Sequence, residues 1–208
     1  MVQQFHRLKE TPSQTAGPYV HIGTMPNFCG IPGIYPADLG ASMVTAETKG
    51  ERIVITGHVY DGAGQPVRDA LLELWQADAN GLYNADHERR GTADPAFSGW
   101  GRQPADPRTG AYRFETIKPG RVPWKDGQPM APHASLWIAA RGINIALHSR
   151  IYFSDETAAN NADPVLARVG LFRRATLIAE RDGEDNGMAV YRHDIRLQGD
   201  GETVFFDI

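Results

Sequence analysis

The stretch APHASLWIAARG, residues 131–142, carries an apolar run with a proline near one end and a glycine at the other. A short apolar run between such residues indicates a β-strand. A similar run, INIALHSRIYF at 143–153, follows at once, so we predict a pair of strands that turns at Arg141. Because side chains alternate along a strand, His133 and Ser135 share one face. That spacing would suit two metal ligands, but only His133 is a common one.

Further segments typical of strands lie on both sides of this pair, at residues 52–60, 67–78, 111–117 and 189–207. In AYRFETI (111–117) aromatic residues alternate with charged ones, as in a strand with one buried face. The segment 189–207 alternates in the same way and contains a GDG turn between two predicted strands. With 22 glycines and 14 prolines marking frequent turns, the pattern predicts an all-β protein. We expect a β-sandwich of seven to nine short antiparallel strands with long loops.

One or two short helices are expected within this all-β fold. The segment ADPVLARVGLF at 162–172 predicts a helix, with Asp163 as its N-cap and Pro164 in its first turn. The polar stretch at 79–110 is rich in glycine and proline, and loops of that length are often functional. The role of residues 84–107 beyond packing stays open.

The first fifty residues have little periodicity and are rich in proline, glycine and threonine. The aromatic residues Tyr19, Phe28 and Tyr35 favour an ordered arm over a flexible tail, which is the alternative. We therefore divide the chain into an N-terminal arm, 1–50, that packs on a partner subunit, and a β-sandwich domain, 51–208.

Composition narrows the classes of function. The formal charge is −4 and no cluster of lysine or arginine stands out, which argues against a nucleic-acid partner. The one cysteine, Cys29, allows no disulfide within the chain and fits a reducing compartment. The N-terminus has no apolar run typical of a secretory signal, and no stretch approaches the length needed to span a bilayer. We expect a cytoplasmic protein.

The residues that could carry chemistry are few. Seven histidines are scattered through the chain, without an H-x-H or H-E-x-x-H pattern. The sequence also lacks a paired CxxC motif and a glycine-rich phosphate loop. From the residues alone, an independent metalloenzyme is therefore not favoured.

Three stretches together resemble the intradiol aromatic-ring dioxygenases: LELWQADANGLY at 72–83, TIKPGRVPW at 116–124, and APHASLWIAARG at 131–142. In catalytic members of that family, the first stretch ends in a tyrosine ligand and the second has a tyrosine before Pro-Trp. The third reads R-P-A-H-I-H, and both histidines bind ferric iron. Phenolate oxygens suit Fe(III) because the ion is hard and highly charged.

Only half of that ligand set is present in this chain. Tyr83 and His133 match two ligands, whereas Val122 and Ser135 stand where the others should be. Met130 stands where the family has an arginine. The resemblance therefore implies remnant ligand positions and no metal in this chain. In the simplest interpretation His133 is a structural histidine and Tyr83 a packed tyrosine.

A more specific resemblance covers about residues 9–208 and is carried by ETPSQTAGPYVHIG near the N-terminus, by 140–153 and by 199–207. These segments are similar to the metal-free subunit of two-chain members of the family. The resemblance implies that a related partner chain holds Fe(III), in a larger assembly of both chains. This chain would close part of the pocket for a dihydroxybenzoate substrate and O2.

The same resemblance implies which residues face that pocket: Thr15, Ala16, Gly17, Pro18, Tyr19 and Arg141. A guanidinium at Arg141 would attract an anionic substrate. The alternatives are that Arg141 is a solvated turn residue and that residues 15–19 only pack at an interface.

Two other functions stay open from the sequence. One is an enzyme that acts by itself, with His148 or His58 joining Tyr83 and His133 in a rebuilt metal site. The other is a β-sandwich binding module without an enzymatic partner.

Overall fold

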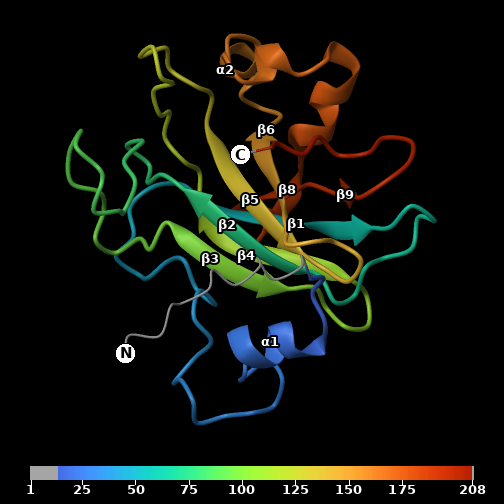
Figure 1. The fold of residues 1–208 in the computed structure, drawn as a ribbon. Coiled ribbons are helices and arrows are strands. Elements are labelled where there is room, and N and C mark those ends of the chain that lie inside the picture. Colours follow the sequence, from blue (N-terminus) through green and yellow to red (C-terminus); the bar gives the residue numbers. More distant parts are fainter. Residues whose placement is uncertain (1–13, 208) are drawn as a thin grey trace, which may run out of the picture.

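The computed structural model describes residues 14–207, which form nine strands in one sheet (Figure 1). Along the sheet the strands follow the order β3-β2-β5-β6-β7-β8-β1-β4, and β9 pairs with β1. Their bounds are β1 Arg52–Tyr60, β2 Leu71–Gln76, β3 Trp100–Pro104, β4 Ala111–Ile117, β5 His133–Ala139, β6 Leu147–Phe153, β7 Ile178–Asp185, β8 Met188–Arg192 and β9 Ile195–Arg196. The prediction of an all-β protein is confirmed.

The sheet is an almost closed barrel, so the prediction of a two-layer sandwich is wrong. The strands at the two ends of the order, β3 and β4, lie close to each other. Parallel pairs, β1 with β8, β1 with β9 and β6 with β7, also interrupt the expected antiparallel pattern. Alternation along a strand tells which side is buried, but it does not tell whether the ends of a sheet meet.

Most of the other strands were predicted, but two were missed. Strand β3 lies within the stretch 79–110 that we interpreted as a loop, and β7 falls between the predicted segments. The pair at 131–153 is confirmed, because β5 and β6 are antiparallel with Ser135 opposite Arg150. In β4, Tyr112 and Phe114 are buried, while the charged residues that alternate with them are exposed. Gly57 in β1 has to be glycine, because a Cβ atom there would lie 2.0 Å from the backbone oxygen of His193.

The end of the chain differs from the prediction. The GDG turn forms, with positive φ at Gly199 and Gly201, but no second strand follows it within the described residues. Thr203 N still donates to Arg196 O of β9 at 2.9 Å, and the residues after Thr203 lie against β6 instead. There the Phe206 N–H donates to His148 O at 2.8 Å, and the Ser149 hydroxyl donates to Val204 O. This path buries Val204 against the barrel.

The predicted helix at 162–172 is replaced by two 3-10 segments, η1 Leu166–Arg168 and η2 Leu171–Leu177. Gly170, with ψ of 134°, breaks the helical path between them. Asp163 does cap this region, since its Oδ1 accepts hydrogen bonds from Val165 N and Leu166 N at 2.8 Å. The helices are α1 Pro18–Thr24, in the arm, and α2 Thr157–Asn161.

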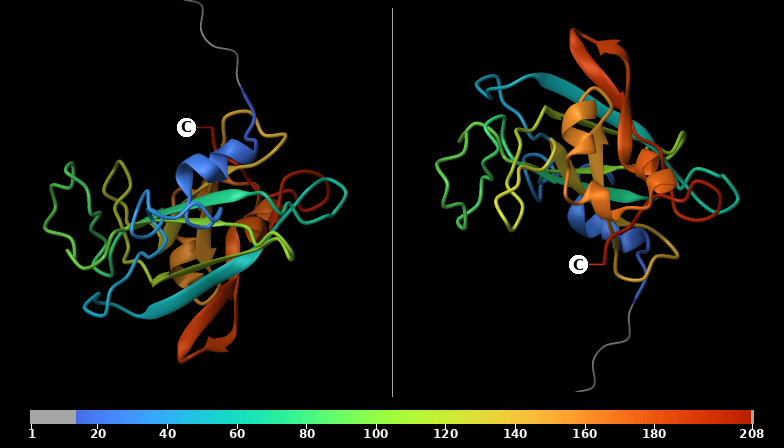
Figure 2. Two further views of the ribbon diagram at one scale, coloured as in Figure 1. Left: turned by 90° about the horizontal axis from the view of Figure 1, so that it is seen from below. Right: turned by 90° about the horizontal axis from the view of Figure 1, so that it is seen from above.

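Residues 14–50 of the predicted arm lie on this chain's own barrel, and the first thirteen residues fall outside the described part. Thr15 pairs with Asn144 in the β5–β6 turn, and Met25 is buried against Leu71 and Ala139. Figure 1 places α1 at one end of the barrel and α2 at the other, and in Figure 2 the β7–β8 hairpin projects on the side away from α1. Within residues 14–207 no helix has the length and apolar character of a membrane span.

We expect Asp163→Ala to lower the free energy of unfolding by about 3 kcal/mol. The carboxylate is fully buried, and its Oδ2 also accepts a hydrogen bond from Ala131 N at 2.7 Å, which ties the η1 region to the entry of β5. Its removal leaves buried N–H groups without partners. Urea unfolding measures the effect, and Asp200→Ala, at an exposed turn, is the control. Equal loss in the two variants would contradict this role.

Candidate functional site

Three of the four remnant ligand positions line two hollows of the protein, and the fourth, His133, lines neither. Tyr83, Val122 and Met130 line the smaller hollow, of about 410 Å³. Ser135 lines the larger one, of about 510 Å³. Ser135 lies in β5 between its neighbours Trp75 of β2 and Arg150 of β6, so strand pairing brings these residues together.

His133 is buried and held in place by the protein. Its Nδ1 lies 2.8 Å from Ala131 O, and its ring contacts the ring of Tyr152 with 5.6 Å between centroids. Burial, assisted by the positive charge of Arg150, lowers the pKa of His133 to about 4. The imidazole is therefore neutral at pH 7. This agrees with the interpretation of His133 as a structural histidine.

Tyr83 and Val122 contribute to packing in the smaller hollow. The Tyr83 ring stacks on Trp75 at 5.9 Å between centroids and 4° between planes. Burial raises the pKa of the Tyr83 phenol above its usual value, which opposes the phenolate form that Fe(III) prefers. Val122 is buried in an apolar cluster with Met130 and Val165 and has no donor atom to offer.

Arg150 was not singled out from the sequence, yet it brings a permanent positive charge to this region. Its guanidinium lies 3.4 Å from the sulfur of Met130 and 3.4 Å from the hydroxyl of Tyr152. The same charge lowers the pKa of both Tyr83 and His133, partly offsetting the effect of burial at the tyrosine. The predicted pairing of β5 with β6 could have identified Arg150, because the register of that pair sets Arg150 opposite Ser135.

The residues present do not fit a ferric ion. Two of the four ligand positions lack a suitable donor, the remaining tyrosine favours its protonated form, and an arginine charge lies beside the site. A cation at Arg150 repels Fe(III) in a partly buried setting, where screening by water is weak. Across residues 14–207 no group of three histidine, cysteine, aspartate or glutamate side chains is placed to hold a metal.

The rebuilt metal site that was left open is not favoured. His148 lines the larger hollow with Ser135 and Arg150. His58 lies elsewhere, in β1, where its ring stacks on Tyr60 and its Nδ1 is 3.6 Å from an Asp194 oxygen. His58 lines neither of the two hollows that three of the remnant positions line.

Of the predicted pocket residues in the arm, Thr15 contacts the β5–β6 turn that carries the predicted arginine. The Thr15 hydroxyl accepts a hydrogen bond from Gly142 N at 2.8 Å and donates to Ala140 O at 3.3 Å, so it holds both sides of Arg141. The Arg141 Nε lies 2.9 Å from an Asp69 carboxylate oxygen. Gly142, with φ of 88°, makes this turn possible.

These residues do not enclose a pocket within this chain. The Tyr19 residue is 83% exposed and the Arg141 side chain 75% exposed. Arg141 lines a shallow hollow of about 460 Å³ with Gly142 and Leu147, and none of residues 15–19 lines it. Whether the segment 15–19 and Arg141 face a substrate stays a prediction.

The arm also exposes large apolar side chains over a short length of chain. The exposed residues are Tyr19, Ile22, Phe28, Ile31, Ile34, Tyr35 and Leu39. So many exposed large apolar side chains within one short segment are typical of a region that another molecule covers.

The fold and these positions define a class of protein. A family model described as dioxygenase matches residues 36–199, and the chain belongs to the intradiol dioxygenase family. The chain is 48% identical to the protocatechuate 3,4-dioxygenase alpha chain of Pseudomonas putida, over 96% of this chain and 97% of that one. It is 38% identical to the beta chain of Burkholderia cepacia protocatechuate 3,4-dioxygenase, over 76% of this chain and 68% of that one.

The fold is also similar to that of solved dioxygenase structures. The crystal structure of 3-chlorocatechol 1,2-dioxygenase from Rhodococcus opacus matches with a TM-score of 0.59 and 22% identity, over 80% of this chain and 67% of that one. At this identity the likeness establishes the shared fold.

We expect the purified chain to contain far less than one iron per chain. Restoring donors with Val122→Tyr and Ser135→His should still give substoichiometric iron, because the Arg150 charge remains. Adding Arg150→Gln should raise the iron content of that double variant at least severalfold. Elemental analysis and the visible absorption of an iron–tyrosinate bond measure this. Arg181→Gln on the same background is the control, and one iron per unmodified chain would contradict the expectation.

Proposed function

We propose that this chain acts as the alpha chain of a two-chain protocatechuate 3,4-dioxygenase. The assembly would insert both atoms of O2 into 3,4-dihydroxybenzoate and give 3-carboxy-cis,cis-muconate, in the β-ketoadipate pathway of aromatic catabolism. The beta chain would hold the Fe(III), and this chain would hold none. The near full-length similarity to an alpha chain, and the lower similarity to a beta chain, support this assignment.

One observation carries the proposal most strongly. The chain keeps the barrel of an intradiol dioxygenase, but Val122 and Ser135 occupy two of the four ligand positions. The guanidinium of Arg150 lies beside these positions. A chain that cannot hold the metal needs a second chain that does. The bound iron would activate the substrate ring toward oxygen, and this chain's residues would bind and orient the substrate.

The arm and the β5–β6 turn would supply the contact with the beta chain and with the substrate. Pro18 at the start of α1 fixes the backbone after Gly17, and Tyr19 projects outward from that helix. Arg141 is exposed beside this segment, so a covering beta chain would leave its charge near the substrate carboxylate. A complex of several alpha and beta chains in the cytoplasm agrees with the exposed apolar residues of the arm and with the free thiol of Cys29.

Co-expression with a beta chain tests the assignment. We expect iron, visible colour and oxygen uptake on protocatechuate from the complex, while this chain alone is colourless and inactive. A beta chain expressed alone is the matched control. Full activity from this chain alone would refute the proposal, as would a failure of the two chains to co-purify.

Arg141→Ala tests the charge at the proposed pocket. Loss of an attractive charge for an anionic substrate should raise KM for protocatechuate roughly tenfold and change kcat little. Arg113→Ala is a matched control, because Arg113 is also exposed to solvent and, like Arg141, pairs with a surface carboxylate, here that of Asp185. The role of Arg141 is rejected if both variants keep the KM of the unmodified complex.

A further inference from the structure

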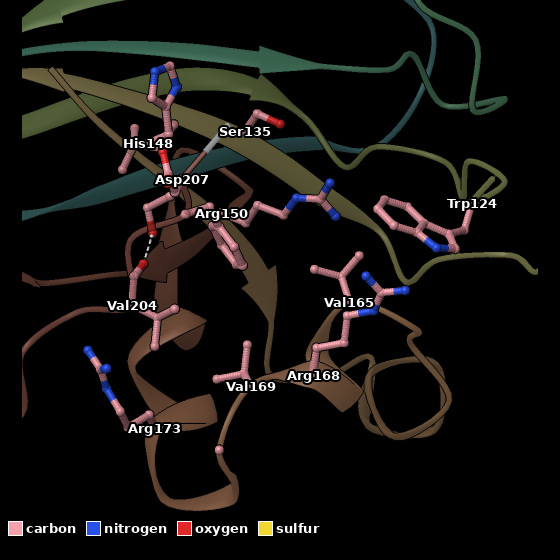
Figure 3. Close-up of a pocket in the computed structure, with 14 residues that line it drawn as sticks. Trp124, Ser135, His148, Arg150, Val165, Arg168, Val169, Arg173, Val204 and Asp207 are labelled. Carbon is pink, nitrogen blue, oxygen red and sulfur yellow. Dashed lines mark hydrogen bonds between the residues drawn. The ribbon is translucent and has the colours of Figure 1, made fainter.

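The larger hollow, which the proposed function does not use, has the features of a ligand site (Figure 3). Its volume of about 510 Å³ lies within the range of small-molecule pockets. Strands β5 and β6 form one side, η1 and the start of η2 form another, and the C-terminal segment closes a third. The three walls come from distant parts of the sequence, so folding alone creates this hollow.

The walls combine aromatic and aliphatic surface with positive charge, and one carboxylate, Asp207, lines the side of the hollow opposite Trp124 in Figure 3. Trp124 stands at one end, and Val165, Val169 and Phe206 add apolar surface. Figure 3 shows the side chains of Arg150 and Arg168 directed toward the Trp124 end. The Arg168 guanidinium lies 5.5 Å from the centre of the Trp124 ring.

These two arginines have no carboxylate within 4 Å among residues 14–207, unlike Arg173 at the other end, which lies 3.2 Å from a Glu202 oxygen. Arg150 is half-buried and contacts only neutral groups, the Met130 sulfur and the Tyr152 hydroxyl. A half-buried guanidinium without an anionic partner is stabilised when an anion binds to it.

We propose that this hollow binds a small aromatic carboxylate. The carboxylate would accept hydrogen bonds from Arg150 and Arg168, and the ring would lie against Trp124 and the two valines that flank η1. The planar carboxylate group matches the planar donors of a guanidinium. The aromatic ring would cover the aromatic wall better than the chain of an aliphatic acid would. Ser135 is small enough to leave this space open, and its hydroxyl can donate one more hydrogen bond.

This site is separate from the one at Arg141 and does not depend on which activity the assembly has. Arg141 lines a different hollow, at the β5–β6 turn. The anion site needs only residues of this chain, so it would be present once per chain. It would hold an aromatic acid without transforming it.

Equilibrium dialysis with radiolabelled benzoate tests the proposal on the full-length chain, purified together with its co-expressed partner where one is bound. Benzoate lacks the two hydroxyls of a ring-cleavage substrate and is not consumed. We expect each chain to bind one benzoate at a site that depends on the two arginines. Arg150→Gln and Arg168→Gln should each lower the affinity for benzoate at least tenfold. Benzamide, a neutral molecule of the same shape, should bind at least tenfold more weakly than benzoate.

Arg181→Gln is the matched control, because Arg181 is exposed on β7 and does not line the hollow. Arg168 is exposed as well, so its variant decides the question if Arg150→Gln fails to fold. Unchanged benzoate binding in Arg168→Gln would overturn the proposal, and so would equal affinity for benzamide. Any benzoate site on a beta chain would be the same in all variants and would cancel from the comparison.

Discussion

The pairing of β5 with a strand on each side is the constraint on which the rest of this structure depends. Its hydrogen bonds to β2 and β6 are satisfied on both edges, and one of its faces supplies Ala134, Leu136 and Ile138 to the barrel core. The opposite face has to present His133 and Ser135 at the end of the barrel. The register of the same pairs then sets Trp75 and Arg150 on the two sides of Ser135.

The consequence at the remnant ligand positions is electrostatic. Where catalytic relatives are expected to have two phenolates and two imidazoles, this chain has one buried neutral histidine, one tyrosine that favours its protonated form, and a guanidinium. The fixed positive charge and the missing anionic ligands both weaken the binding of a trivalent cation. The barrel itself tolerates these changes, because its core lies on the other face of β5.

The two ends of the β5–β6 hairpin therefore have different surroundings. At the strand ends the chain forms a hollow with apolar walls and two arginines, Arg150 and Arg168, that have no carboxylate within 4 Å among the described residues. At the turn, Thr15 fixes the backbone around Arg141, but the side chains remain open to solvent. An open, partly apolar surface gains free energy when a partner covers it, whereas the hollow at the strand ends can be completed by a small molecule.

The sequence by itself determined most of the strands, though not β3 and β7, together with the missing ligands and the family, because alternation and local motifs are properties of neighbouring residues. Val122 and Ser135 could be identified as poor ligands without coordinates, and Asp163 as a cap. Only the tertiary structure decided that the sheet closes into a barrel, that Gly170 divides the predicted helix, and that the last residues lie on β6. The same holds for Arg150, whose place beside His133 depends on strand register and burial. Such contacts join segments that are distant in the sequence, so local sequence patterns do not predict them.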